Sequence, residues 1–312
     1  MCLMGPTATG KTELALALAG RLPVTLISVD SAMVYRHMDI GSGKPPPSVL
    51  AQHPHRLVDI RDPWEQYSAG DFAPDALREI RTARAAGRIP LLVGGTFLYF
   101  RSLVQGLSAL PPADAAVRAE IDRRAATEGW PALHAELGRI DPVAATRIGV
   151  TDRQRIQRAL EVSLLTGQPI SALQGRGVGA PGCRFLRVGL LPGDRELLRD
   201  RIRQRLGRML EQGFIAEVER LLAMPAMDRQ RPALRAVGYR QLVRYVTGAC
   251  TRAAAEADAL AATRQLARRQ LTWLRREACD LWLDMAGDDL PGALEQAVRA
   301  AARADAISGP SG

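Results

Sequence analysis

Short apolar runs rich in β-branched residues recur along the chain, and stretches of helical character separate them. The runs lie at residues 2–4, 24–29, 56–60, 90–93, 185–190 and 281–283. Most are continuously apolar rather than alternating between apolar and polar positions, which is typical of strands buried on both faces. Such strands alternating with helices predict an α/β fold, in which helices cover both faces of a parallel sheet.

One long segment, residues 111–182, breaks this alternation. It opens on Pro111-Pro112, continues through stretches rich in Ala, Arg and Glu, and closes on a glycine-rich run at residues 175–182. Because no strand-like run lies inside it, we predict two domains: an α/β core made of residues 1–110 and 183–312, and an all-helical insertion domain at residues 111–182. Two long helices are expected later in the core, at residues 195–224 and 253–279.

The strongest motif lies between the first apolar run and the first helical stretch. It reads Gly5-Pro6-Thr7-Ala8-Thr9-Gly10-Lys11-Thr12 and fits the pattern G-x-x-x-x-G-K-[ST] at every fixed position. Glycines let backbone N–H groups turn inward around an anion, Lys11 adds a positive charge, and the Thr12 hydroxyl can bind Mg²⁺. The following helix directs its positive end at the same point. The motif predicts a polyphosphate site on a P-loop NTPase-like fold, but not which phosphate ester it holds.

Polar clusters follow three of the predicted strands. They lie at residues 30–31, 59–62 and 94–96, and we expect them at one edge of the sheet, where ligands of such folds bind. Asp30 could bind a metal or act as a general base, or it could cap the turn that follows. The run Gly94-Gly95-Thr96 could bring backbone and a hydroxyl close to a ligand, or it could form a tight turn that Thr96 caps.

Composition indicates the kind of partner. The 312 residues carry a formal net charge of +9 and a pI of about 10.1, which favours a polyanion such as nucleic acid. Only Lys11 and Lys44 are lysines among the 42 basic residues. A preference for Arg over Lys explains which basic residue is used, but not why basic residues outnumber acidic ones. The four cysteines have no C-x-x-C spacing, and no run of eighteen apolar residues occurs. We therefore expect no zinc site, no disulfide framework, no membrane span and a cytoplasmic location.

Three basic clusters could bind such a polyanion. Residues 263–276 predict a helix without acidic residues, with an arginine-rich face separate from its apolar stripe. The other clusters are residues 153–158, in the insertion, and residues 235–240, where arginines accompany Tyr239. A solvated surface would explain any one of them, but three clusters around one phosphate site favour a large polyanion. The four histidines show no ligand spacing, and we assign them no catalytic role.

Taken together, these segments resemble the bacterial tRNA dimethylallyltransferases, also called tRNA isopentenyltransferases. The resemblance follows nearly the whole chain in order, through residues 5–12, 27–35, 38–41, 54–60, 67–69, 87–96, 152–162, 236–241 and 263–275. That family transfers a dimethylallyl group from its diphosphate to N6 of the adenosine 3′-adjacent to the anticodon, in tRNAs that read codons beginning with U. The resemblance implies dimethylallyl diphosphate and the tRNA anticodon stem-loop as substrates and Mg²⁺ as cofactor. We expect a monomer that does not bind membranes.

The resemblance also implies roles for individual residues. Residues 5–12 and Arg205 would hold the diphosphate, and Thr12 would bind Mg²⁺. Asp30 would accept the proton of N6, and Thr96 would contact the target base. Contacts to tRNA are expected from several parts of the chain: Asp30, Ser31, Ala32, Met33, Thr96, Arg118, Gln154, Arg155, Ile156, Gln157, Arg158, Arg235, Gly238, Tyr239, Arg240, Arg268, Arg269, Gln270, Thr272, Trp273 and Arg275.

One departure from the family pattern and three alternatives stay open. Family members usually carry several more apolar residues before the loop than Met1 to Met4, so the first strand is short or the true start lies upstream. A small-molecule kinase would share the loop but use a compact arginine lid. A nucleic-acid-binding NTPase would need a strand ending in paired acids, of which residues 281–284 are a faint echo. An enzyme that prenylates free adenine nucleotides would not need the basic helix.

Overall fold

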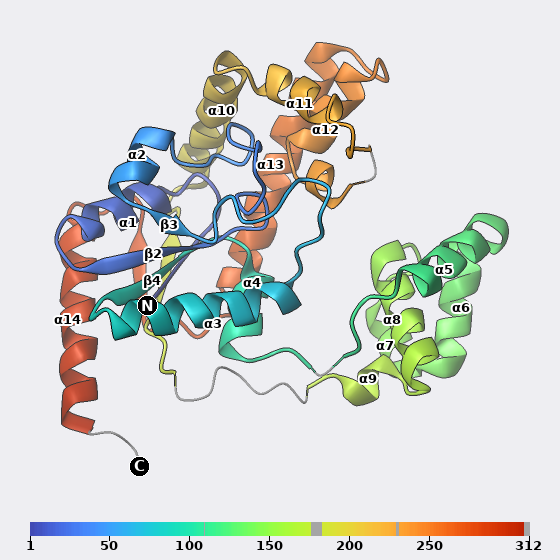
Figure 1. The fold of residues 1–312 in the computed structure, drawn as a ribbon, viewed down its shortest axis with the longest axis horizontal. Coiled ribbons are helices and arrows are strands. Elements are labelled where there is room, and N and C mark those ends of the chain that lie inside the picture. The colour runs from blue at the N-terminus through green and yellow to red at the C-terminus, as the bar shows by residue number, and fades with distance from the viewer. Residues whose placement is uncertain (109, 176–182, 229–230, 309–312) are drawn as a thin grey trace. The chain divides into compact units, whose positions relative to one another are not determined.

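The computed structural model describes residues 1–108, 110–175, 183–228 and 231–308. Six parallel strands form one sheet in the order β3-β2-β4-β1-β5-β6 (Figure 1). The strands are β1 (Cys2–Met4), β2 (Val24–Val29), β3 (His55–Arg56), β4 (Ile89–Gly94), β5 (Arg187–Leu191) and β6 (Leu281–Asp284). The predicted α/β class with a parallel sheet is therefore confirmed.

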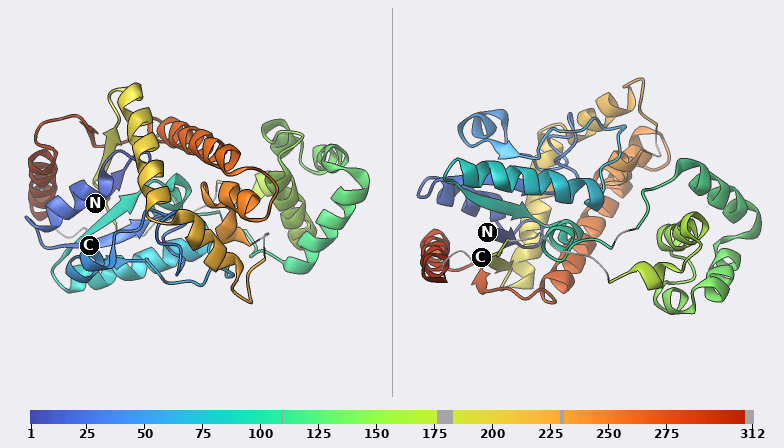
Figure 2. Two further views of the ribbon diagram at one scale, coloured as in Figure 1. Left: turned by 90° about the horizontal axis from the view of Figure 1, so that it is seen from above. Right: turned by 60° about the horizontal axis from the view of Figure 1, so that its bottom comes forward.

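Helices cover both faces of the sheet, as the apolar strands require (Figure 2). On one face α1 (Lys11–Ala19) and α14 (Leu290–Ser308) share a buried cluster with α10 (Arg195–Glu211) and α13 (Arg252–Leu274), to which Leu14, Leu18, Ile202 and Leu294 contribute. On the other face α3 (Ala69–Ala85) packs against β2 and β4. The aromatic rings of Phe72 and Tyr99 stack there at 4.6 Å between centroids, and Tyr99 belongs to α4 (Phe97–Val104).

The first and third strands differ from what the sequence suggested. β1 is short, yet it pairs on both sides, since Cys2 lies opposite Leu92 of β4 and opposite Arg187 of β5. The predicted strand at residues 56–60 is mostly wrong. β3 ends at Arg56, because Leu57 and Asp59 adopt left-handed φ angles of +63° and +56°, which do not continue a strand.

The predicted helix at residues 195–224 is broken in two. It ends as α10 at Glu211 and resumes as α11 (Phe214–Leu222), because Gly213 between them adopts φ +96°. The helices α2 (Pro47–Gln52) and α12 (Tyr239–Val246) and the 3₁₀ helix η1 (Pro232–Arg235) complete this part of the chain. Within the described residues, no helix is long and apolar enough to cross a bilayer.

The chain divides into two compact units, Met1–Leu103 with Gly182–Gly312 and Val104–Pro181, which we call the core unit and the helical unit. The helical unit begins at Val104, where α4 ends, rather than at residue 111 as the sequence suggested. It contains α5 (Ala115–Glu128), α6 (Trp130–Ile140), α7 (Pro142–Arg147), α8 (Arg153–Thr166) and α9 (Ile170–Leu173). These helices enclose a separate apolar core that includes Ile121, Leu133 and Ile156.

Candidate active site

The carboxyl ends of three neighbouring strands lie level with one another. Met4 of β1 pairs with Gly94 of β4, and Gly94 pairs in turn with Val29 of β2. The segments that follow these strands, residues 5–12, 30–33 and 95–96, therefore leave the sheet at one edge, which we call the rim. Three polar segments that are far apart in the sequence thus meet at one place.

The phosphate loop, residues 5–12, follows β1 and is closed by its own hydrogen bonds. The Thr9 hydroxyl donates to the carbonyl oxygen of Pro6 at 2.8 Å, and the Lys11 ammonium donates to the same oxygen at 2.5 Å. Gly5 leaves no room for a side chain, since a Cβ there would lie 2.9 Å from the carbonyl oxygen of Leu190. The loop therefore sits directly against the neighbouring strand.

The N-terminus of α1 opens into this loop. Gly10, the residue before the helix, adopts φ +87° and has no side chain to cap the first turn. Ala8 also has a left-handed φ of +65°, a strained conformation for a residue with a Cβ. The first-turn N–H groups and the helix dipole therefore point to a place where an anion can be bound.

Two half-buried cations meet at the phosphate loop: Lys11 belongs to it, and Arg205 comes from α10. Burial, and then the nearby charge of Arg205, lower the pKa of the Lys11 ammonium to about 7. Burial also lowers the pKa of the Arg205 guanidinium, against the charges of Asp30 and Glu13. Charged groups held in this way are poorly solvated, so an anion between them would be strongly favoured. The electrostatics of the rim fit a ligand with several negative charges.

Arg205 reaches the rim from α10. Ile202 and Leu206, its neighbours on that helix, are buried and fix the helix in place. The guanidinium donates to the carbonyl oxygen of Ser42 at 3.4 Å. It passes so close to Gly43 that a Cβ there would lie 1.9 Å from one of its nitrogens. A distant helix and a glycine-containing loop together bring this arginine to the phosphate loop.

Asp30 follows β2, and its two carboxylate oxygens have different surroundings. Its Oδ1 accepts the N–H groups of Ala32 at 2.8 Å and Met33 at 3.2 Å, so it caps the turn, as one of the two sequence interpretations held. Among the described residues, its Oδ2 has no hydrogen-bond donor. The capped turn fixes the carboxylate, and the second oxygen can accept a proton from a substrate.

Thr96 joins the turn after β4 to the segment after β2. Its hydroxyl oxygen accepts the N–H of Ser31 at 3.2 Å, while its own N–H donates to the carbonyl oxygen of Val29 at 3.3 Å. Gly94 permits this approach, since a Cβ there would lie 2.0 Å from that same carbonyl oxygen. The run therefore forms both the tight turn into α4 and a polar part of the rim.

Gln270 was predicted to contact tRNA, but its half-buried side chain forms hydrogen bonds inside the core unit. It accepts the N–H of Thr7 at 2.9 Å and donates to the carbonyl oxygen of Gly95 at 2.9 Å. Its helix thus supports the rim directly. Periodicity gave no sign of these contacts, because both partners lie far away in the sequence.

The rest of α13 presents the expected basic surface. Arg268, Arg269, Thr272 and Arg275 are exposed. The half-buried Trp273 lies under the guanidinium of Arg101, 5.2 Å from its ring centroid. These side chains can contact a phosphate backbone or an unstacked base.

The cluster at residues 235–240 is split between surface and core. Arg235 and Arg240 are exposed, but Gly238 and Tyr239 are buried. The Tyr239 hydroxyl donates to Glu217 Oε1 at 2.7 Å. The prediction that Tyr239 contacts tRNA is therefore wrong for its side chain, which stabilises the interior instead.

The helical unit requires a similar correction. Ile156 belongs to its apolar core, so its side chain cannot contact RNA. Arg118 donates through Nε and Nη2 to the buried Glu161, at 2.9 and 3.0 Å, and Arg158 donates to the same carboxylate at 2.7 Å. A buried carboxylate needs such partners, so these two arginines are first of all structural.

Three predicted RNA-contacting residues of α8 remain at the surface of the helical unit. Gln154 and Arg155 are exposed, although Arg155 forms an ion pair with Asp152 at 3.1 Å. Gln157 is half-buried and donates to Asp122 at 2.7 Å. Exposed polar side chains of this kind remain available to a partner.

The structure adds two buried charged residues that the sequence did not single out. Glu217 accepts the N–H groups of Asp39, Ile40 and Gly41 at 2.8 to 3.1 Å. Lys44, whose side chain is 3% exposed, forms ion pairs with two aspartates. In the sequence, only the scarcity of lysine drew attention to Lys44. Nothing in the sequence indicated that Glu217 is buried, because it looks like any acidic residue of an amphipathic helix. Both fix the segment that follows β2.

The rim offers few protein ligands to a metal ion. In the part of the chain that the structure describes, no group of three or more His, Cys, Asp or Glu side chains could hold an ion. Among the threonines of the loop, Thr12 stands in the first turn of α1, directly after Lys11, and it can offer its hydroxyl to an ion. This donor set suits Mg²⁺, which keeps several waters and takes its other ligands from substrate phosphates.

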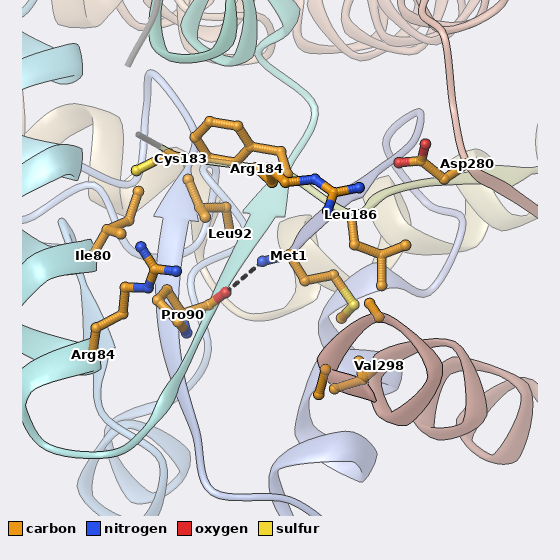
Figure 3. A pocket seen from close by; sticks show the side chains of 13 residues that line it. Met1, Ile80, Arg84, Pro90, Leu92, Cys183, Arg184, Leu186, Asp280 and Val298 are labelled. Atoms are coloured by element: carbon orange, nitrogen blue, oxygen red, sulfur yellow. Dashed lines mark hydrogen bonds between the residues drawn. The ribbon is translucent and has the colours of Figure 1, made fainter. Parts of the chain in front are cut away.

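A cavity of about 360 Å³ lies at the opposite end of the sheet (Figure 3). Met1 and Pro90, which line it, stand at the amino ends of β1 and β4, where the Met1 ammonium donates to the Pro90 carbonyl at 2.8 Å. It is therefore remote from the rim.

Residues 281–284 do not form the acidic strand end that a nucleic-acid-binding NTPase would need beside its phosphate loop. Asp284 lies on the edge strand β6, and β5 separates this strand from β1, which leads into the loop. The Asp284 carboxylate accepts the N–H of Ala286 instead.

Fold and site together define a phosphate-loop α/β protein that brings an anion-binding loop and a carboxylate to one rim. The chain belongs to the IPP transferase family, whose sequence pattern matches residues 33–277, and it is a prenyltransferase. It is 54% identical to the tRNA dimethylallyltransferase of Stenotrophomonas maltophilia (strain R551-3), over 91% of this chain and 92% of that protein. It is also 53% identical to the tRNA dimethylallyltransferase of Thioalkalivibrio sulfidiphilus (strain HL-EbGR7), over 97% of this chain and 96% of that protein.

A solved structure gives the same result. The full-length tRNA isopentenylpyrophosphate transferase from Bacillus halodurans is 35% identical, with a TM-score of 0.69 over 96% of this chain and 95% of that one. The family resemblance drawn from the motifs is therefore confirmed.

Proposed function

We propose that this protein transfers a dimethylallyl group from dimethylallyl diphosphate to N6 of the adenosine 3′-adjacent to the anticodon, in tRNAs that read codons beginning with U. The observation that carries the proposal is the composition of the rim. Two poorly solvated cations, Lys11 and Arg205, stand within electrostatic range of one carboxylate, Asp30. The cations suit a leaving diphosphate, and the carboxylate suits a proton acceptor. The names of the relatives support the same reaction.

The phosphate loop binds the diphosphate through backbone N–H groups and Lys11, and Arg205 neutralises it from the other side. Mg²⁺ held by the Thr12 hydroxyl would supply further positive charge to the leaving group. The C1–O bond of the dimethylallyl group breaks, and the diphosphate leaves with the electron pair. A new bond forms between C1 and N6.

Proton removal addresses the weakness of the nucleophile. The lone pair of an exocyclic adenine amine is delocalised into the ring, so N6 attacks poorly while it keeps both protons. The Oδ2 atom of Asp30 accepts one of them as the bond forms. Thr96, joined to the Asp30 turn through Ser31, contacts the target base beside it.

The target adenosine must leave its stack to reach this rim. Three exposed arginines hold the RNA backbone: Arg240 of α12, Arg268 of α13, and Arg275 directly after α13. Gln154 and Arg155 add contacts from the helical unit. The surface therefore supplies affinity, and the rim supplies the chemistry.

The direct test is incubation with unmodified tRNA and dimethylallyl diphosphate labelled in the prenyl group. We expect label in tRNA at the adenosine beside the anticodon, located by nuclease digestion and mass spectrometry. Label in a free adenine nucleotide, or no label in any nucleic acid, would overturn the proposal. Phosphate transfer to a small molecule would instead support a kinase.

A further inference from the structure

Gln270 connects two parts of the rim that the chain itself keeps far apart. Its Oε1 accepts the N–H of Thr7 in the phosphate loop, and its Nε2 donates to the carbonyl oxygen of Gly95 after β4, both at 2.9 Å. The amide thus uses an acceptor and a donor at once. Neither a carboxylate nor an apolar side chain can replace both bonds.

The connection is tight as well as polar. A Cβ on Gly95 would lie 2.4 Å from Nε2 of Gln270 and 3.1 Å from the carbonyl oxygen of Gly5. The residue after Gly95 is Thr96, which is bonded to the Asp30 turn through Ser31. A shift of Gln270 therefore changes the spacing between the loop for the diphosphate and the turn for the target base.

The helix that carries Gln270 also carries the basic surface. Arg268 and Arg269 immediately before it are exposed, and Trp273 follows one turn later. Ala267 and Leu271, on the inner side of α13, are buried. RNA bound to the outer side can therefore act on the rim through one rigid helix.

We propose that Gln270 is a positioning residue that couples the binding of the two substrates. RNA on α13 fixes the helix, and the amide of Gln270 then holds the phosphate loop and the turn after β4 at the spacing that both substrates require. Coupling of binding is reciprocal, so diphosphate on the loop strengthens RNA binding by the same factor. This inference rests on the proposed function.

The test measures the dissociation constant of unmodified tRNA with and without saturating inorganic diphosphate and Mg²⁺. Wild type is expected to bind tRNA roughly 5- to 20-fold more tightly when diphosphate is present. Gln270→Met is expected to bind about equally in both conditions, with its affinity for tRNA alone within about threefold of wild type. Gln296→Met changes an exposed glutamine of α14 and is the matched control, which keeps the coupling.

The proposal is overturned if wild type shows no coupling, or if Gln270→Met couples as strongly as wild type. It is also overturned if Gln270→Met loses as much tRNA affinity without diphosphate as Arg268→Ala/Arg275→Ala does, which would make Gln270 an RNA contact.

A second variant guards against misfolding. Gln270→Glu keeps the acceptor for Thr7 and loses the donor for Gly95, so it should retain partial coupling, and circular dichroism melts identify any variant that is not folded. If Gln270→Glu is folded and couples as wild type does, the proposal fails. The proposed function is tested separately by the labelling assay: it fails if wild type transfers no prenyl label to tRNA, whatever the binding measurements show.

Discussion

Lys11 is expected to control how diphosphate binding depends on pH. Burial and the charge of Arg205 lower the pKa of its ammonium from 10.5 to about 7. The free protein then carries about half of this charge at pH 7 and about one tenth at pH 8. A bound diphosphate favours the charged form and raises the pKa. Binding should therefore take up close to one proton at pH 8, and affinity should fall about tenfold for each pH unit above 7.

Isothermal titration with dimethylallyl diphosphate and Mg²⁺, without tRNA, tests this between pH 7 and pH 9. Two buffers of different ionisation enthalpy separate proton uptake from affinity. Lys11→Arg is the matched control, because a guanidinium stays charged over this range. An affinity of wild type that does not change with pH, or a slope that persists in Lys11→Arg, refutes the reasoning.

The same shift makes a prediction for stability. Because the pKa of Lys11 is lower in the folded protein than the ordinary 10.5, the unfolded chain binds more protons between about pH 7 and pH 10.5. The cost of burying the charged group is complete below about pH 7 and is relieved as the pH rises. Urea denaturation should show this increase in the free energy of unfolding between pH 7 and pH 9, and Lys11→Met should lack it.

Three further variants test the site and its support. Asp30→Asn keeps an oxygen that caps the turn, so turnover should fall about 10²- to 10⁴-fold with tRNA affinity nearly unchanged; equal losses in single-turnover rate and binding would argue against a general base. Removing Arg268 and Arg275 together should weaken tRNA binding and lower its salt slope by about 1.4, and an unchanged slope would exclude them from phosphate contact. Glu217→Ala leaves three N–H groups and a phenol without a partner, so the free energy of unfolding should fall by about 3 kcal/mol. The control Glu219→Ala, at an exposed site on the same helix, should change the free energy of unfolding little. Similar losses in both variants would contradict the role of Glu217.

Much of the rim could be predicted from local sequence. The pattern Gly5 to Thr12 requires only neighbouring residues, and its position between an apolar run and a helix was sufficient to predict a phosphate loop. Asp30 and Thr96 could be placed beside it because parallel strands end at a common edge, and the register of Met4, Gly94 and Val29 bears this out.

The sequence could not show which polar side chains also have partners inside the protein. An arginine looks the same in the sequence whether it faces solvent or a buried carboxylate, and Arg118 and Arg158 both donate to Glu161. Tyr239 beside two arginines suggested a contact with tRNA, but its hydroxyl donates to Glu217 inside the core.

The sequence by itself thus determined the class of fold, the phosphate loop, the order of the rim segments and the resemblance to a family. Each of these depends on periodicity or on residues adjacent in the chain. Only the tertiary structure decided which polar side chains are committed to the interior. Gln270 shows why, since its partners Thr7 and Gly95 lie 263 and 175 residues away. No local pattern specifies such a pair; it forms because helix packing brings one amide between two loops.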